Sequence, residues 1–157
     1  VETQCAYLWK GERRRHGKGI SGLIPMGTTG ESHAITEAEF EKIIGSKRSY
    51  VKTALMDQNT IAGIGNIYSD EILFQANLFP KRKTNELEIV DIKKLYDSIQ
   101  YVLKIATEEL VDDKKLPKHF IMPYRDKDET CPVCGTHIKR LEISNRHGFY
   151  CPKCQIK

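Results

Sequence analysis

Two closely spaced cysteine pairs near the end of the sequence constrain its folding more than any other feature. Cys131 and Cys134 form the first pair, Cys151 and Cys154 form the second, and 16 residues separate the pairs. This C-x2-C-x16-C-x2-C spacing is typical of sites in which two cysteine turns supply four thiolates to one tetrahedral zinc ion. We therefore predict a separate module over residues 131–157 that binds one zinc ion through these four cysteines.

We expect this zinc to be structural, because four thiolates fill the tetrahedron and leave no position for a reactive water. A module this short buries little apolar area, so the metal would supply most of its folding free energy. Paired disulfides are the alternative, which the lack of a signal peptide near Val1 disfavours. His137 and His147 lie between the pairs and are alternative ligands. Cys5 is left over, and we interpret it as an inert thiol rather than a nucleophile.

The residues between the cysteine pairs predict a β-hairpin. Apolar residues in 138–143 mark its first arm, Phe149 and Tyr150 mark its second arm, and residues 145–148 would form the turn. Arg146 would then lie at the exposed tip of a rigid hairpin. Its guanidinium carries a fork of donors that matches two phosphate oxygens, although a simple solvated turn residue is also possible.

Apolar periodicity predicts a mainly α domain over residues 36–113. Thr36 and Glu39 have capping-box spacing at its start. Asn77 suits the left-handed backbone position that often ends a helix, and Pro80 is typical of the residues just after a helix end. Helices are expected at about residues 37–44, 48–56 and 67–76, followed by a long one that starts near residue 85 or 86 and carries an apolar stripe from Ile92 to Leu110.

Charge and composition bound the class of protein. With 39% hydrophobic and 29% charged residues among 157, the chain fits a folded protein, and no apolar run is long enough to cross a membrane. A cytoplasmic location is the resulting expectation. The net charge of +4 does not by itself require a polyanionic partner, but residues 10–18 carry +4 and residues 114–157 carry +6. We expect residues 1–35 to be an irregular basic segment and residues 114–130 to be a linker with a short strand.

A glycine turn interrupts the helices upstream of the cysteine module. Gly63 and Gly65 break helicity, and Asn66 is a good cap for the helix that follows. Together with Phe79-Pro80, the long helix and the terminal Tyr150-Cys-Pro-Lys-Cys-Gln, the stretch LMDQNTIAGIGNIYSDEILF closely resembles the formamidopyrimidine-DNA glycosylase family, whose relatives include endonuclease VIII. The resemblance covers residues 36–155. It implies a helix-two-turns-helix bundle followed by a β-hairpin zinc finger.

The resemblance also implies a function. The chain would be the damaged-DNA-binding region of a base-excision-repair DNA glycosylase/AP lyase that removes oxidised bases of the 8-oxoguanine or formamidopyrimidine type. Its partner would be kinked double-stranded DNA bound through phosphates, and the protein would be a monomer in a prokaryotic-type cytoplasm, associated with the nucleoid. Glycine amides and a helix start can approach a phosphate closely. The implied DNA contacts are Asn66, Arg146, Gly63 and Gly65, with secondary contacts from Lys52 and Tyr124.

The family's catalytic residues have no counterpart in this sequence. The family nucleophile is an amino-terminal proline on a β-sandwich domain, which needs about 100 residues. Here the chain opens Val1-Glu2-Thr3, and about 35 residues precede the helical domain. We therefore assign no catalytic residue and expect DNA binding without chemistry. The short Lys-Pro segment between Leu110 and Phe120 replaces a longer loop of oxidised-purine members, so lesion preference stays open between purines and pyrimidines.

Two other functions stay open at this point. The first is a non-catalytic RNA- or DNA-binding protein, because helix-two-turns-helix units with no lesion chemistry also occur in a ribosomal protein. The second is an intact enzyme in which the amine of Val1 or a lysine forms the Schiff base. Competition between RNA duplex and abasic DNA would separate the first from the glycosylase interpretation, and borohydride trapping on abasic DNA would test the second.

Overall fold

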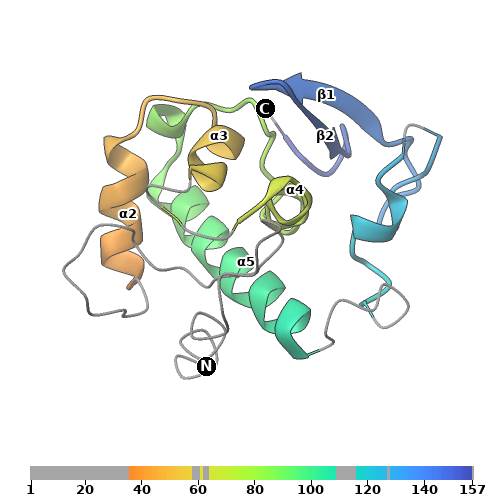
Figure 1. The fold of residues 1–157 in the computed structure, drawn as a ribbon, viewed down its shortest axis with the longest axis horizontal. Coiled ribbons are helices and arrows are strands. Elements are labelled where there is room, and N and C mark those ends of the chain that lie inside the picture. Colours follow the sequence, from red (N-terminus) through yellow and green to blue (C-terminus); the bar gives the residue numbers. More distant parts are fainter. Residues whose placement is uncertain (1–35, 58–60, 62–63, 109–115, 127, 157) are drawn as a thin grey trace, which may run out of the picture.

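Helices form most of the structure, and a two-stranded antiparallel hairpin lies at its carboxy-terminal end (Figure 1). This computed structural model describes residues 36–57, 61, 64–108, 116–126 and 128–156. The predicted mainly α fold with a terminal hairpin is confirmed. In chain order the elements are α2 (Glu37–Ser46), α3 (Val51–Met56), α4 (Asn66–Gln75), the 3-10 helix η1 (Thr84–Glu86), α5 (Ile89–Glu108), the 3-10 helix η3 (Met122–Tyr124), β1 (Lys139–Ile143) and β2 (Arg146–Tyr150). The predictions made for residues 1–35, Gly63 and Leu110 lie outside the described residues.

Helix α2 starts as its capping box predicts. The Thr36 hydroxyl accepts a hydrogen bond from the Glu39 amide at 3.3 Å, and the Glu39 carboxylate accepts one from the Thr36 amide at 2.9 Å. These two bonds satisfy amide groups that a helix start leaves without partners. Phe40 and Ile44 on the inner face are fully buried, which fixes α2 against the core.

Helix α3 starts at Val51 rather than near Arg48 as predicted. The residues before it are extended and pair with the segment that leads to α5. The Thr84 hydroxyl donates to the Lys47 carbonyl oxygen at 2.7 Å, and the Thr84 amide donates to the Ser49 carbonyl oxygen at 2.9 Å. This long-range pairing leaves only six residues for α3.

Helix α5 supplies the longest apolar face of the core. It packs against α4 and α2. It starts at Ile89, later than predicted, because the separate 3-10 turn η1 precedes it. Six positions of the predicted apolar stripe are at most 7% exposed, namely Ile92, Leu95, Ile99, Val102, Leu103 and Ala106.

A second, smaller core holds the cysteine module against α4. Phe74 of α4 packs there with one residue before the cysteine pairs and one between them, and the cluster consists of Phe74, Ile121, Cys131, Ile138 and Cys151. The Gln155 side chain reinforces the contact, since it accepts from the Cys151 amide at 2.8 Å and donates to the Leu78 carbonyl oxygen at 2.9 Å. The module is therefore docked on the helical part of the fold.

The hairpin turn is tighter than the sequence suggested. Only Ser144 and Asn145 form it, with φ values of 52° and 62°, and Ile143 pairs directly with Arg146. A two-residue turn with positive φ at both positions matches the twist of the flanking strands. Arg146 is consequently the first residue of β2 beside the turn, and the predicted four-residue turn over 145–148 is wrong.

The short strand expected within residues 114–130 is also wrong for the residues that the structure describes there. Those residues form η3 and a single bridge between Thr130 and His137. Pro123 lacks a backbone donor, and the amides of Ile121 and Met122 bond to the Glu71 carboxylate instead of to a neighbouring strand.

Within the described ranges, no helix has the length and apolar character that crossing a bilayer requires.

Candidate nucleic-acid interface and metal site

The four predicted cysteines meet in one place. Their sulfur atoms all lie within 4.8 Å of one another, and the Cys131–Cys154 and Cys134–Cys151 sulfur pairs are 3.9 and 3.4 Å apart. Tetrahedral zinc with sulfur at about 2.3 Å needs sulfur atoms about 3.8 Å from each other, so the cluster fits the ion. Gly135, with φ of 73°, provides the positive backbone angle of the first cysteine turn.

The thiols of this cluster differ in acidity. Hydrogen bonds with Thr136 lower the pKa of Cys134 to about 6, which favours the thiolate that binds metal. Burial raises the pKa of Cys151 and Cys154. Protons must leave such thiols when zinc binds. Among the described residues His137 and His147 are not part of the cluster, so the four-cysteine interpretation holds over a mixed ligand set.

Asn66 is the first residue of α4 rather than the cap in front of it. Gly65 holds the capping position, with extended backbone at φ of −92°, and no side chain caps the helix. The Asn66 side chain points across to the hairpin, where its Nδ2 donates to the His147 carbonyl oxygen at 2.8 Å. Since His147 follows Arg146, the glycine turn and the arginine of the hairpin are held next to each other.

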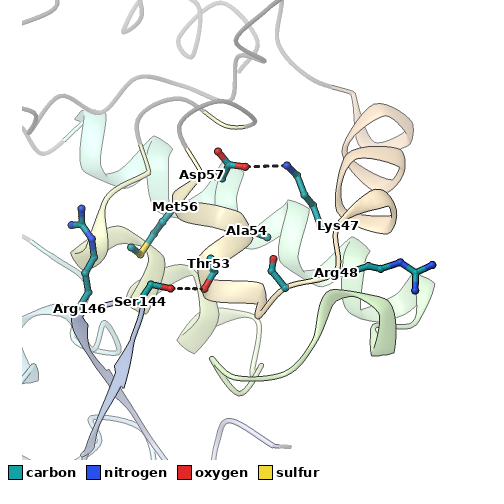
Figure 2. Close-up of a pocket in the computed structure, with 9 residues that line it drawn as sticks. Lys47, Arg48, Thr53, Ala54, Met56, Asp57, Ser144 and Arg146 are labelled. Carbon is teal, nitrogen blue, oxygen red and sulfur yellow. Dashed lines mark hydrogen bonds and ion pairs between the residues drawn. The ribbon is translucent and has the colours of Figure 1, made fainter.

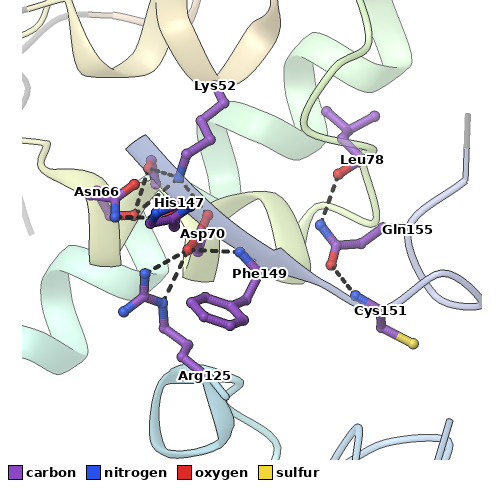
Figure 3. Close-up of polar contacts among 10 residues, drawn as sticks. Lys52, Asn66, Asp70, Leu78, Arg125, His147, Phe149, Cys151 and Gln155 are labelled. Atoms are coloured by element: carbon purple, nitrogen blue, oxygen red, sulfur yellow. Dashed lines mark hydrogen bonds and ion pairs between the residues drawn. The ribbon is translucent and has the colours of Figure 1, made fainter. Parts of the chain in front are cut away.

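Lys52 lies in the interior and not on the surface. Its side chain is 0% exposed, and its Nζ donates to the Ser69 hydroxyl at 2.8 Å and to the Asn66 carbonyl oxygen at 3.2 Å (Figure 3). It also forms an ion pair with Asp70. Burial lowers the pKa of Lys52, and Asp70 opposes that effect. A buried ammonium with these partners does not fit the secondary phosphate contact predicted for Lys52, and in this structure Lys52 supports the start of α4.

Asp70 is the centre of the contacts between α4 and the hairpin. It is 0% exposed, and its Oδ2 accepts from Arg125 at 2.8 and 3.0 Å and from the Phe149 amide at 3.2 Å, while Oδ1 faces Lys52. The Arg125 guanidinium also lies 5.1 Å from the centre of the Phe149 ring. Figure 3 shows these groups converging from α3, α4, the segment after η3 and β2. We call the set Lys52, Asp70, Arg125 and Phe149 the Asp70 node.

Gly148 permits this close packing of β2. A Cβ atom at Gly148 would lie 3.1 Å from Asp70 Oδ1, 3.2 Å from a Leu141 methyl carbon and 3.3 Å from Lys52 Cε. Such distances are tight enough that neighbouring atoms would have to shift, which the buried ion pair resists. Sequence reasoning placed Gly148 only in a turn and missed this role.

Glu71 joins α4 to η3 and was also missed. It accepts hydrogen bonds from the Met122 amide at 2.8 Å, the Ile121 amide at 3.3 Å and the Gln75 side chain at 2.8 Å. Burial raises the pKa of Glu71 to about 7, while these hydrogen bonds act in the opposite direction. The one feature of the sequence that could have indicated the roles of Asp70 and Glu71 is that these two acids are adjacent on a helix whose neighbouring residues are mostly apolar.

Comparison with known proteins identifies the helical part. Residues 26–114 match the family model described as the formamidopyrimidine-DNA glycosylase H2TH domain, which covers more than half of the chain. The chain belongs to the formamidopyrimidine-DNA glycosylase family. Residues 128–156 match a second family, the zinc finger found in FPG and IleRS. With the sulfur cluster, this match establishes a structural zinc site formed by Cys131, Cys134, Cys151 and Cys154.

Relatives in this glycosylase family are longer than this chain. It is 31% identical over 155 residues to formamidopyrimidine-DNA glycosylase of Listeria monocytogenes, covering 90% of this chain and 56% of that protein. It is 37% identical over 119 residues to that of Pasteurella multocida, covering 69% and 44%. The chain thus spans about half the length of the curated relatives it matches.

Solved structures of glycosylase family members show the same fold. Lactococcus lactis Fpg in complex with DNA containing an abasic site superposes with a TM-score of 0.69 at 29% identity, over 85% of this chain and 52% of that one. MutM in complex with DNA containing carbocyclic 8-oxo-G superposes with a TM-score of 0.70 at 29% identity, over 85% and 51%. The shared fold therefore includes both the helical domain and the hairpin.

The other residues predicted to contact DNA do not all lie near Asn66 and Arg146. Tyr124 ends η3 and is half-buried beside Arg125, but among the described residues no hydrogen bond joins it to Asn66 or Arg146. Gly65 is exposed in front of α4, and Gly63 lies outside the described residues. Asn66, Gly65 and Arg146 are thus the predicted contacts that the structure gathers in one neighbourhood.

Proposed function

We propose that this chain is the DNA-binding region of a base-excision-repair DNA glycosylase/AP lyase, which binds kinked, damaged duplex DNA as a monomer through backbone phosphates. The observation that carries the proposal is the 2.8 Å hydrogen bond between Asn66 and the His147 carbonyl oxygen, which holds the start of α4 beside exposed Arg146. A helix start offers free amides and a partial positive charge, and arginine offers a fork of donors. A helix start and an arginine held side by side suit consecutive phosphate groups of one DNA strand.

The solved relatives support this partner, since their printed complexes contain abasic, formamidopyrimidine and 8-oxoguanine DNA. We propose oxidised bases as the substrate class of the complete enzyme and a cytoplasmic, nucleoid-associated location. Thiolate zinc ligands persist in a reducing compartment, which fits that location. No catalytic role is proposed for any residue of this chain. Gly63 stays proposed as a phosphate contact of the glycine turn, and Tyr124 as a secondary contact.

Arg146→Ala tests the proposal directly. We expect it to weaken binding to a duplex that contains an abasic site and to lower the slope of log affinity against log salt by about 0.9, the value for one lost phosphate contact. Fluorescence anisotropy over a salt series measures both quantities. Lys104→Ala, which removes an exposed charge from α5, is the matched control and should leave the slope unchanged. Equal behaviour of the two variants would contradict the phosphate contact.

Gly65→Val separates a binding role from a folding role. The backbone of Gly65 is extended, and a Cβ there would meet nothing within 4 Å, so the fold tolerates a side chain. A phosphate that approaches the Gly65 and Asn66 amides would not tolerate it. We expect at least tenfold weaker duplex binding together with only a small drop in the unfolding midpoint, because valine is a poorer capping residue than glycine. Retained affinity would mean that DNA does not approach this turn.

A further inference from the structure

A hollow lies between the hairpin turn and α3. Its volume is about 480 Å³, and its walls come from the link between α2 and α3, from α3 and from the turn. Figure 2 shows Arg146 at one side of the hollow and Arg48 at the other, with Thr53 and Ser144 between them. Resting on the proposed function, we propose that this hollow is a second phosphate subsite, which holds a further phosphate of the DNA strand bound at Arg146.

The charges around the hollow favour an anion. Lys47 is neutralised by Asp57 at 2.9 Å, and both side chains are 32% exposed. Arg48 and Arg146 are exposed, and within the part of the chain that the structure describes neither has an ion-pair partner. Arg48 and Arg146 stand at opposite ends of the hollow, and Figure 2 shows the Arg48 side chain extending outward, away from the other lining residues. The positive potential of these two arginines would draw a polyanion to this surface.

Hydroxyl groups between the two arginines suit phosphate oxygens. Thr53 Oγ1 and Ser144 Oγ lie 3.3 Å apart, and either can donate to the other. When one donates, the second keeps its proton for an external acceptor. The backbone of Ser144 is held in a tight two-residue turn with positive φ, which places its side chain beside Thr53. Arginine, serine and threonine side chains all donate to phosphate oxygens in nucleic-acid complexes.

The position of the hollow selects a nucleic-acid strand over a free anion. Arg146 lines it and is at the same time the hairpin residue next to the Asn66 contact. Figure 2 shows Ser144 next to Arg146, then Thr53 and then Arg48, so a strand that continues past Arg146 along this surface would meet them in that order. This order predicts that the subsite takes a phosphate further along the same strand, in one direction from the phosphate at Arg146.

The experiment compares Arg48→Gln, Arg146→Gln and the control Lys104→Gln in the full chain, by anisotropy with an abasic-site duplex over a salt series. We expect Arg48→Gln to weaken binding about three- to tenfold at low salt and to lower the salt slope by about 0.9, as Arg146→Gln does, while Lys104→Gln changes neither. If Arg48→Gln leaves affinity and salt slope unchanged, as Lys104→Gln does, while Arg146→Gln lowers the salt slope by about 0.9, the subsite is wrong and the proposed function stands. If wild type does not bind duplex DNA at all, the proposed function itself fails.

A second measurement needs no change in the protein. Single methylphosphonate substitutions along each strand remove one backbone charge at a time, and two positions on one strand should weaken binding by wild type. The position served by Arg48 should lose its effect in Arg48→Gln and keep it in Arg146→Gln. Isothermal titration with inorganic phosphate tests the other source of this anion. Binding of inorganic phosphate that depends on Arg48, with no Arg48-dependent methylphosphonate position, would overturn the proposal.

Discussion

Removal of zinc is expected to abolish duplex binding by this chain while most of its helical content remains. The cysteine module contains the hairpin that presents Arg146, and a two-stranded hairpin is at best marginally stable by itself. A structural zinc contributes about 10–16 kcal/mol of apparent binding free energy in small finger modules at neutral pH. Without the ion, nothing of comparable size holds the two cysteine turns together.

The helical part has its own support. Its larger core is formed mainly by residues of α2, α3, α4 and α5 and includes none of the four zinc ligands. We therefore expect a chelator with high zinc affinity to leave most of the far-ultraviolet circular dichroism signal. Duplex affinity, measured by anisotropy on the same sample, should fall by more than a hundredfold.

Cysteine variants make the same test without a chelator. Cys151→Ser removes a buried zinc ligand and should reproduce the loss of binding. Cys5→Ser is the matched control, because the sequence predicts an inert thiol at that position. Metal analysis must accompany each binding curve. Undiminished binding by a sample shown to be free of zinc would mean that the finger does not position Arg146.

Local sequence patterns predicted the parts of this fold that depend on local chemistry. The capping box at Thr36, the apolar stripe of α5 and the metal ligands at Cys131 and Cys134 each follow from spacings of a few residues. Boundaries failed where distant partners decided them. The start of α3 is one such case, because Thr84 bonds the preceding residues across 35 and 37 positions.

The interior of the candidate site could not be predicted for the same reason. Lys52, Asp70 and Arg125 are separated by 18 and 55 positions along the chain, and no period connects them. A lysine one turn before a glycine motif has the sequence appearance of a surface cation. Only the docking of β2 over α3 and α4, which Gly148 permits, turns it into a buried ion-pair partner.

Asp70→Ala is expected to cause the largest loss of stability of any single substitution considered for this chain. It would leave the Lys52 ammonium, which is 0% exposed, without its counter-ion. It would also remove the acceptor for Arg125 and for the Phe149 amide. Removing one partner of a buried pair typically costs 3–5 kcal/mol, so we expect a loss of about 4 kcal/mol in the free energy of unfolding.

The control and the pH dependence make this prediction specific. Asp97→Ala changes an exposed residue of the same type on α5 and should alter stability by less than about 0.5 kcal/mol. Burial already lowers the pKa of Lys52 from its ordinary value, and loss of Asp70 would lower it further. The unfolded chain then binds more protons than the folded one between the lowered pKa and about 10.4, so the stability of Asp70→Ala should rise with pH in that window.

A double-mutant cycle with Lys52→Met shows whether the cost comes from the stranded charge. Methionine keeps an unbranched side chain in the cavity without the ammonium, so Asp70→Ala combined with Lys52→Met should recover part of the lost stability. Urea unfolding of the four proteins gives the coupling energy. If the double variant is no more stable than the sum of the single losses predicts, the Asp70 node is held by packing rather than by charge. We expect duplex affinity in these variants to depend on whether the hairpin stays docked and not on the ion pair itself, since Arg146 is presented only when β2 lies against α4.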